Sequence, residues 1–244
     1  MEPASIAFAV VAVFCGAFVR GYTGFGSSMI WVSSLSLVFP PILVIPAVFL
    51  LEIAVGANLL PKVWREVEWR SLRWLLAGAV VATPAGLYLL AALPAAPVRI
   101  AIAVVILAAT ISLWRGFAWR AVPGAWPAAA AGMLAGAMNG STGIGGPPVI
   151  LFYFSSPAAV GVSRASVIAF LFGLDVIGAA MAAGQGLYGA EALVLALVLV
   201  VPVLVGISLG NRRFLKADPE RFRRFVLILL AALSVAVLVR AVVA

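Results

Sequence analysis

Histidine is absent from the 244-residue sequence, cysteine occurs once, and charged residues make up only 10% of the chain. With Cys15 alone and no histidine, neither an intrachain disulfide nor a cysteine–histidine metal cluster can form. Without histidine, a cysteine pair or a dense carboxylate cluster, we expect no cofactor, no metal and no enzymatic activity. Apolar residues make up 65% of the chain, well above their share in soluble domains. A soluble globule cannot bury so much apolar surface, so the chain is expected to lie in a lipid bilayer.

Long apolar segments predict an all-α polytopic membrane protein. A helix of about 20 residues, rising about 1.5 Å per residue, crosses a hydrocarbon core of about 30 Å. Segments of this kind occupy residues 41–60, 74–93, 98–114, 162–183, 190–209 and 225–243.

Two further segments, 4–39 and 126–155, are each divided by a glycine-rich stretch, at residues 21–26 and 139–146. Three of the four resulting arms are too short to cross the bilayer. Backbone broken by glycines survives at membrane depth only against protein or water. Each segment is therefore predicted to form a re-entrant helix hairpin.

The positive charges predict the topology. Basic residues gather in short connections at 62–73, 115–120 and 211–224, which together with Arg164 hold 13 of the 16 lysines and arginines. Short basic loops stay in the cytoplasm, and these share one side only if 126–155 crosses the membrane an even number of times, as a hairpin does. The net charge of +8 is thus a topology signal of a multi-pass protein, and no nucleic-acid partner is expected.

The chain also resembles itself at an offset of 119 residues, which predicts two repeats, 1–120 and 121–244. Each repeat has one hairpin followed by three spans. Because three is odd, the second repeat starts on the opposite side of the membrane, and the repeats are inverted, a layout typical of transporters. The positions that coincide are Gly21, Thr23, Gly24 and Gly26 with Gly140, Thr142, Gly143 and Gly145.

The glycine-rich stretches are candidates for an anion site. A helix that begins inside the membrane presents unpaired N–H groups and the positive end of its dipole, and helices are expected to begin near Ser27 and Pro147. The alternative is that the glycines only allow close helix packing, which the spacing of Gly132, Gly136 and Gly140 indicates. The candidate substrate-binding residues are Arg20, Gly21, Tyr22, Thr23, Gly24, Phe25, Gly26, Ser27, Asn139, Gly140, Ser141, Thr142, Gly143, Ile144, Gly145 and Gly146.

Three charged residues, Arg20, Glu52 and Asp175, lie far from the ends of the expected membrane segments, where charge is costly and usually functional. Arg20 either contacts the anion, pairs with Glu52 or Asp175, or extends to the membrane surface. Glu52 and Asp175 lie midway along 41–60 and 162–183, either as proton-coupling acids or in a structural hydrogen bond or ion pair. Cys15 is expected to be a small core residue.

Taken together, these features resemble the TauE/SafE family of membrane proteins, described as sulfite and organosulfonate exporters. The paired loops at 21–26 and 140–148 carry the resemblance most specifically. It implies transport of a small sulfur-containing anion, with or without protons, across the bacterial inner membrane, with both loops as substrate-site candidates. The expected function is a secondary transporter that works by alternating access and moves sulfite, an organosulfonate or a related sulfur-containing or carboxylate anion. The alternative is a passive anion channel. The expected partners are the anion, protons and the bilayer, and apolar faces permit a homodimer without requiring one.

Overall fold

The computed structural model describes residues 2–94, 124–154 and 159–214, with residues 96–98, 100, 101, 104, 107, 108, 111, 115, 228, 235 and 239. Within these residues the chain is helical and forms no β-strand, which confirms the all-α prediction. The spans expected at 98–114 and 225–243 lie largely outside the described residues. The elements in chain order are α1 (Pro3–Thr23), α2 (Ser27–Leu35), α3 (Pro41–Val63), the 3₁₀ helix η1 (Trp64–Glu66), α4 (Trp69–Ala92), α6 (Ala125–Thr142), α7 (Gly146–Phe154), α8 (Val160–Gly184) and α9 (Ala190–Phe214).

Several of these helices are long and apolar enough to cross a membrane, so the chain is a multi-pass membrane protein. The described candidates are Pro3–Tyr22, Pro41–Glu66, Trp69–Ala92, Gly161–Gly184 and Ala190–Arg212. Four of them coincide with expected spans. The fifth, which lies in α1, is the longer arm of the first expected hairpin.

Two helix breaks interrupt the chain where glycines predicted them. Within the two glycine-rich stretches, the non-helical residues are 24–26 and 143–145, because α1 continues to Thr23 and α6 to Thr142. The loops expected at 21–26 and 139–146 are therefore too long. Gly24 and Gly143 end their helices in the left-handed conformation, with φ of 86° and 70°, which favours glycine. The helices that follow, α2 and α7, have nine residues each, about 14 Å of helix, too short to cross the bilayer.

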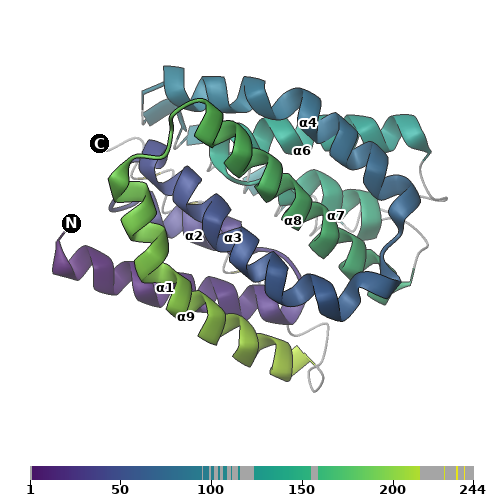
Figure 1. Ribbon diagram of the computed structural model, residues 1–244, viewed down its shortest axis with the longest axis horizontal. Coiled ribbons are helices and arrows are strands. Elements are labelled where there is room, and N and C mark those ends of the chain that lie inside the picture. The colour runs from purple at the N-terminus through teal and green to yellow at the C-terminus, as the bar shows by residue number, and fades with distance from the viewer. Residues whose placement is uncertain are drawn as a thin grey trace.

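The helices pack in corresponding pairs. In Figure 1, α4 lies along α6 at one edge of the molecule and α1 along α9 at the other. Between them α3 packs against α8, and these two helices also contact α9 and α4, respectively. The short helices α2 and α7 pack on α3 and α8. Exchanging α1, α2, α3 and α4 for α6, α7, α8 and α9 reproduces this set of contacts.

Glycines bring the edge pairs into backbone contact. A Cβ atom at Gly132 of α6 would lie 1.9 Å from the Leu75 carbonyl oxygen of α4. One at Gly210 of α9 would lie 2.1 Å from the Phe18 carbonyl oxygen of α1. Close approach through small residues is a common way for membrane helices to associate. The glycines in these two contacts are Gly78, Gly86, Gly132, Gly136 and Gly140, and Gly21, Gly206 and Gly210.

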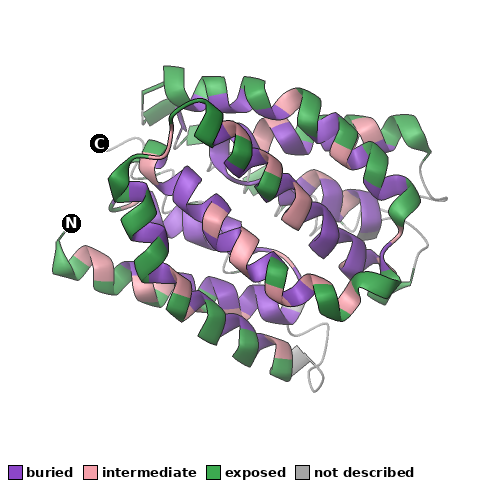
Figure 2. Cartoon of the chain, in the orientation of Figure 1, coloured by how far each residue is buried: buried purple, intermediate pink, exposed green. Residues whose placement is uncertain are grey.

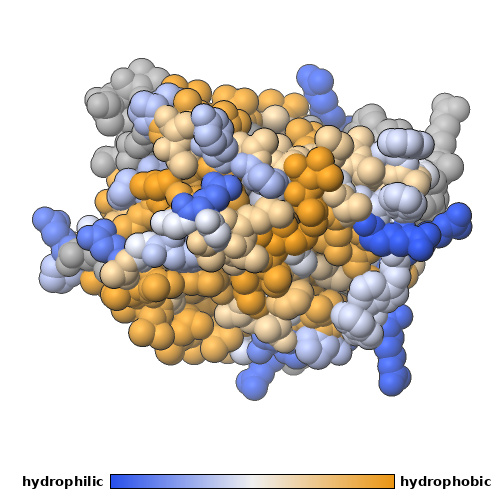
Figure 3. Space-filling view, turned by 45° about the horizontal axis from the view of Figure 1, so that its top comes forward, coloured by the Kyte–Doolittle hydropathy of each residue, from blue (hydrophilic) through white to orange (hydrophobic). Residues whose placement is uncertain are grey.

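Burial increases from the outer helices to the centre. Figure 2 shows α2 and much of α3 buried, while the edge helices expose one face. The exposed face is largely hydrophobic, with hydrophilic side chains mostly at its margins (Figure 3). Large apolar side chains such as Val81 and Leu197 are exposed, as expected for contact with lipid. Cys15 also lies on this exposed surface, so its expected place in the core is wrong.

Candidate functional site

A buried ion pair joins the first helix break to the centre of the molecule. Arg20, in the last turn of α1, and Glu52, midway along α3, are each 1% exposed. The Arg20 Nη1 and Glu52 Oε2 atoms lie 3.0 Å apart. Ser27, the first residue of α2, donates its hydroxyl to Glu52 Oε1 and accepts from Arg20 Nη1 at 3.5 Å. Among the roles open to Arg20, the structure therefore has it paired with Glu52.

The ion pair uses only part of the Arg20 guanidinium. A guanidinium has five N–H donors, yet Arg20 Nε and Nη2 are buried without a hydrogen-bond partner among the described residues. The adjacent helix α2 starts after Gly26, which has no side chain to cap the first N–H groups of the helix. The unpartnered guanidinium donors thus belong to a side chain that contacts the uncapped beginning of α2. The chemistry of this place suits an oxyanion.

Arg164 provides a second cation at the same break. It lies in the first turns of α8, and its Nη2 donates to the Gly21 carbonyl oxygen at 3.2 Å. Its Cγ atom lies 2.9 Å from where a Cβ atom on Gly24 would be. The sequence reasoning missed this role, because it grouped Arg164 with the basic connections. Its position inside the expected span 162–183 is the sequence feature that indicates a role other than that of a loop residue.

The second break has the same layout, with an asparagine in place of the arginine. Asn139, which corresponds to Arg20 at the 119-residue offset, donates from Nδ2 to Asp175 Oδ1 at 3.4 Å. The hydroxyls of Ser141 and Thr142 donate to carbonyl oxygens one turn earlier in α6. Helix α7 then begins with Gly146 followed by two prolines, which have no N–H. This break therefore presents fewer donors than the first.

The other candidate residues have structural contacts. Gly21 and Gly140 lie against α9 and α4, where a Cβ atom would come within 2.4 and 2.6 Å of backbone oxygens. The packing alternative thus explains these two glycines. Tyr22 and Ile144 are buried, Phe25 is partly buried, and nothing is described of the Thr23 side chain.

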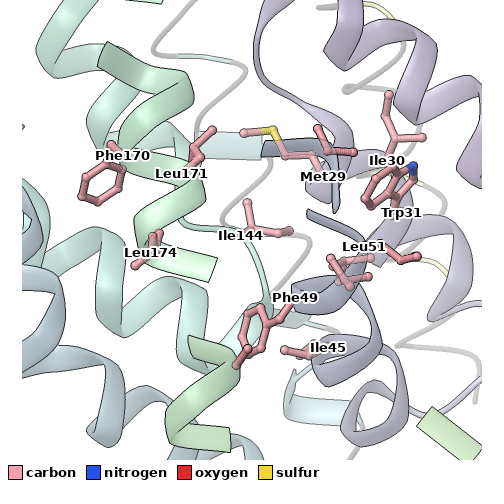
Figure 4. Packing of buried hydrophobic residues seen from close by; sticks show 14 of the residues in the cluster. Met29, Ile30, Trp31, Ile45, Phe49, Leu51, Ile144, Phe170, Leu171 and Leu174 are labelled. Atoms are coloured by element: carbon pink, nitrogen blue, oxygen red, sulfur yellow. The ribbon is translucent and has the colours of Figure 1, made fainter. Parts of the chain in front are cut away.

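Apolar residues pack tightly around the two helix breaks. Figure 4 shows Met29, Ile144, Leu171 and Leu174 together in the core formed by α2, α3, α8 and the second break. A Cβ atom on Gly143 would lie 3.0 Å from Val32 of α2, so the second break packs against the helix that follows the first. Asp175 is 4% exposed, which leaves both pairs enclosed.

The sequence of residues 8–237 matches the family model for the sulfite exporter TauE/SafE. The chain belongs to the TauE/SafE family. This assignment confirms the resemblance noted from the glycine loops. No curated protein and no solved structure matches the chain. The family is one of membrane transporters, which fits the expectation that the protein is not an enzyme.

Tyr188 lies beside the second polar pair of this TauE/SafE protein, in the connection between α8 and α9. Its hydroxyl is buried without a hydrogen-bond partner among the described residues. Burial, and secondarily the Asp175 carboxylate, raises the pKa of Tyr188 to about 12. The phenol therefore stays neutral at physiological pH.

Proposed function

We propose that this TauE/SafE protein is a secondary transporter that moves a small anion across the bacterial inner membrane by alternating access. The substrate class is sulfite, an organosulfonate or a related sulfur-containing or carboxylate anion. Membership of a sulfite exporter family supports the class. The basic connections would lie in the cytoplasm, as the distribution of lysine and arginine requires.

The transport cycle rests on two inverted repeats, 1–120 and 121–244, each starting with a re-entrant hairpin. The corresponding helix contacts and the two short helices after glycine breaks support this arrangement. The polar pairs support it further, since Arg20 with Glu52 and Asn139 with Asp175 join the same elements in each half. Rocking of such repeats against each other opens a central site alternately to the two sides.

The substrate site lies at the first break, and the open side of the Arg20 guanidinium is the observation that carries this proposal. Nε and Nη2 are buried and have no acceptor among the described residues, and Nη1 of the same guanidinium contacts Ser27 at the start of α2. Arg164 adds a second positive charge there. At the second break, Pro147 and Pro148 remove N–H donors and Asn139 is neutral. The two breaks are thus alike in fold and unequal as anion sites.

A passive channel is the second candidate. It would need a continuous polar path, whereas Arg20 and Glu52 are almost fully buried and Asp175 is only 4% exposed. An enclosed site favours alternating access, in which the substrate passes through an occluded state.

Uptake by proteoliposomes tests the proposal. Labelled sulfite, sulfoacetate, taurine and sulfate are offered with and without an inward proton gradient. We expect saturable uptake of at least one anion. Non-saturable flux that ignores the gradient would favour the channel, and absence of flux for all four would remove these anions from the proposal.

A matched pair of variants tests the position of the site. Ser27→Ala removes a hydroxyl at the first break and Ser141→Ala removes one at the second. Ser27 bonds both members of the ion pair, whereas Ser141 donates to carbonyl oxygens of its own helix. We therefore expect Ser27→Ala to displace the Arg20 guanidinium and to raise the KM by up to about tenfold. Ser141→Ala should leave it unchanged. Equal effects of the two variants would contradict the asymmetric site.

A further inference from the structure

The carboxylate of Glu52 also lies where it can accept a proton, and the role inferred for it rests on the proposed anion site. We propose that Glu52 takes up one proton from solution for each negative charge that binds at Arg20, so that Glu52, not Asp175, couples anion binding to protons. Three features carry this inference: the charge balance of the buried pair, the geometry of the guanidinium, and the different partner of Asp175.

The first of these features is the charge balance of the buried ion pair. Arg20 and Glu52 neutralise each other in a site that is closed to water. An anion on the open Nε–Nη2 edge would place the Arg20 guanidinium between two negative groups. Arg164, the other cation at this break, already has the Glu66 carboxylate as a nearby counter-ion, so one negative charge would remain uncompensated. Isolated buried charge is strongly unfavourable, and such a group accepts a proton instead. A proton on a Glu52 oxygen restores neutrality, and the protonated carboxyl can keep its hydrogen bond with Ser27.

The geometry explains why the anion does not have to displace Glu52. The carboxylate holds Nη1, while the unpartnered atoms Nε and Nη2 form the other edge of the same planar group. Two N–H groups on one edge can bind two oxygens of a sulfonate or carboxylate side by side. The anion and Glu52 thus share one cation, and protonation of Glu52 gives that cation to the anion.

Asp175 is less suited to this role. Its hydrogen-bond partner is the neutral Asn139, so protonation of Asp175 frees no cation. Arg20 on α1 contacts Glu52, and Asp175 on α8 interacts electrostatically with both, while Arg164 on α8 lies near Arg20. Helix α2 has no titratable residue, and Lys62 on α3 and Glu191 and Arg212 on α9 lie at helix ends. Of the carboxylates, Glu52 alone contacts the guanidinium among the described residues.

Calorimetric titration of the purified full chain with methanesulfonate tests the inference. This probe is a permanent monovalent anion, so any proton taken up enters the protein. Uptake of one proton per anion raises the Kd by about tenfold per pH unit where Glu52 is ionised in the free protein. We expect this slope in the wild type and in Asp175→Asn, and a Kd independent of pH in Glu52→Gln.

Other outcomes would overturn particular parts of the proposal. Binding without pH dependence in the wild type would refute proton coupling and leave the anion site intact. A slope that persists in Glu52→Gln and disappears in Asp175→Asn would assign the proton to Asp175. No binding of methanesulfonate or sulfite to folded wild-type protein would reject the anion site itself, and the coupling with it. If Glu52→Gln does not fold, infrared difference spectra replace it: the carbonyl band of a newly protonated carboxyl should appear on anion binding in both the wild type and Asp175→Asn, and its absence from either would refute the inference.

Discussion

Removing one member of the Arg20–Glu52 pair should cost far more stability than removing both. At 3.0 Å and an effective dielectric constant of about 20, the attraction amounts to about 5–6 kcal/mol. Transfer of each ion from water costs several kcal/mol, so the pair as a whole contributes little. A single neutral substitution leaves the other charge buried alone, at a cost of about 3–5 kcal/mol. We therefore expect this loss for Arg20→Gln and for Glu52→Gln, and a much smaller change for the double variant Arg20→Met, Glu52→Leu.

Reversible unfolding by SDS in mixed micelles measures these free energies. The second polar pair gives the matched control, because Asn139 and Asp175 form one long hydrogen bond at 3.4 Å without an ion pair. The double variant Asn139→Leu, Asp175→Leu should show a coupling energy of about 1 kcal/mol or less. Single losses below about 1 kcal/mol at Arg20 and Glu52, or a double loss equal to their sum, would refute the reasoning.

The same measurement links stability to the anion site. In Glu52→Gln the guanidinium has no counter-ion, so methanesulfonate should stabilise this variant more than it stabilises the wild type. Equal stabilisation of the two proteins would show that the anion does not bind at Arg20. The double variant, which lacks the guanidinium, should not respond to methanesulfonate.

Two further predictions concern the residues around the breaks. Gly21→Leu and Gly140→Leu should each reduce the yield of folded protein several-fold in size-exclusion profiles, because even a Cβ atom would lie within 2.6 Å of the backbone of α9 or α4. Gly184→Leu, with open space around it, is the control, and equal yields would contradict the packing. Arg164→Gln should raise the Kd for methanesulfonate by about tenfold through loss of a nearby charge, while Arg164→Lys restores part of the affinity and the exposed Lys62→Gln changes nothing. An unchanged Kd in Arg164→Gln would exclude Arg164 from the anion site.

The spans could be predicted from the sequence because a long apolar segment needs no partner to be recognised. The predicted spans 41–60 and 190–209 begin at the same residues as α3 and α9. The same reasoning failed for Cys15, because in a membrane protein the surface that faces lipid is as apolar as the core. Composition alone cannot tell these two environments apart.

The residues at which the helices end before each break depend on tertiary packing. Glycine has a low helix propensity, so the sequence predicts loops at Gly21 and Gly140. In the structure both are helical, because a neighbouring helix lies where a side chain would be. Gly24 and Gly143 were correctly placed in the breaks, since a left-handed residue at the end of a helix is a local requirement.

The sequence identified the unusual charges but not their partners. Charge inside an apolar segment marked Arg20, Glu52 and Asp175 without any structural information. Whether Arg20 pairs with Glu52 or with Asp175 depends on how α1, α3 and α8 are arranged, which no periodicity reveals. Arg164 was overlooked for a similar reason, since its partner is a backbone carbonyl 143 residues away.

The difference between the two breaks follows from the cost of buried charge. A second arginine in place of Asn139 would add a positive charge that Asp175 must balance at all times, and two such pairs would bind two anions and two protons in one enclosed core. With Asn139, the second half keeps the same contact between corresponding helices through a hydrogen bond from an uncharged donor. Both cations, Arg20 and Arg164, therefore lie at the first break, although the helix contacts of the two halves correspond. Under the proposed function, this difference confines the substrate anion to one of the two breaks.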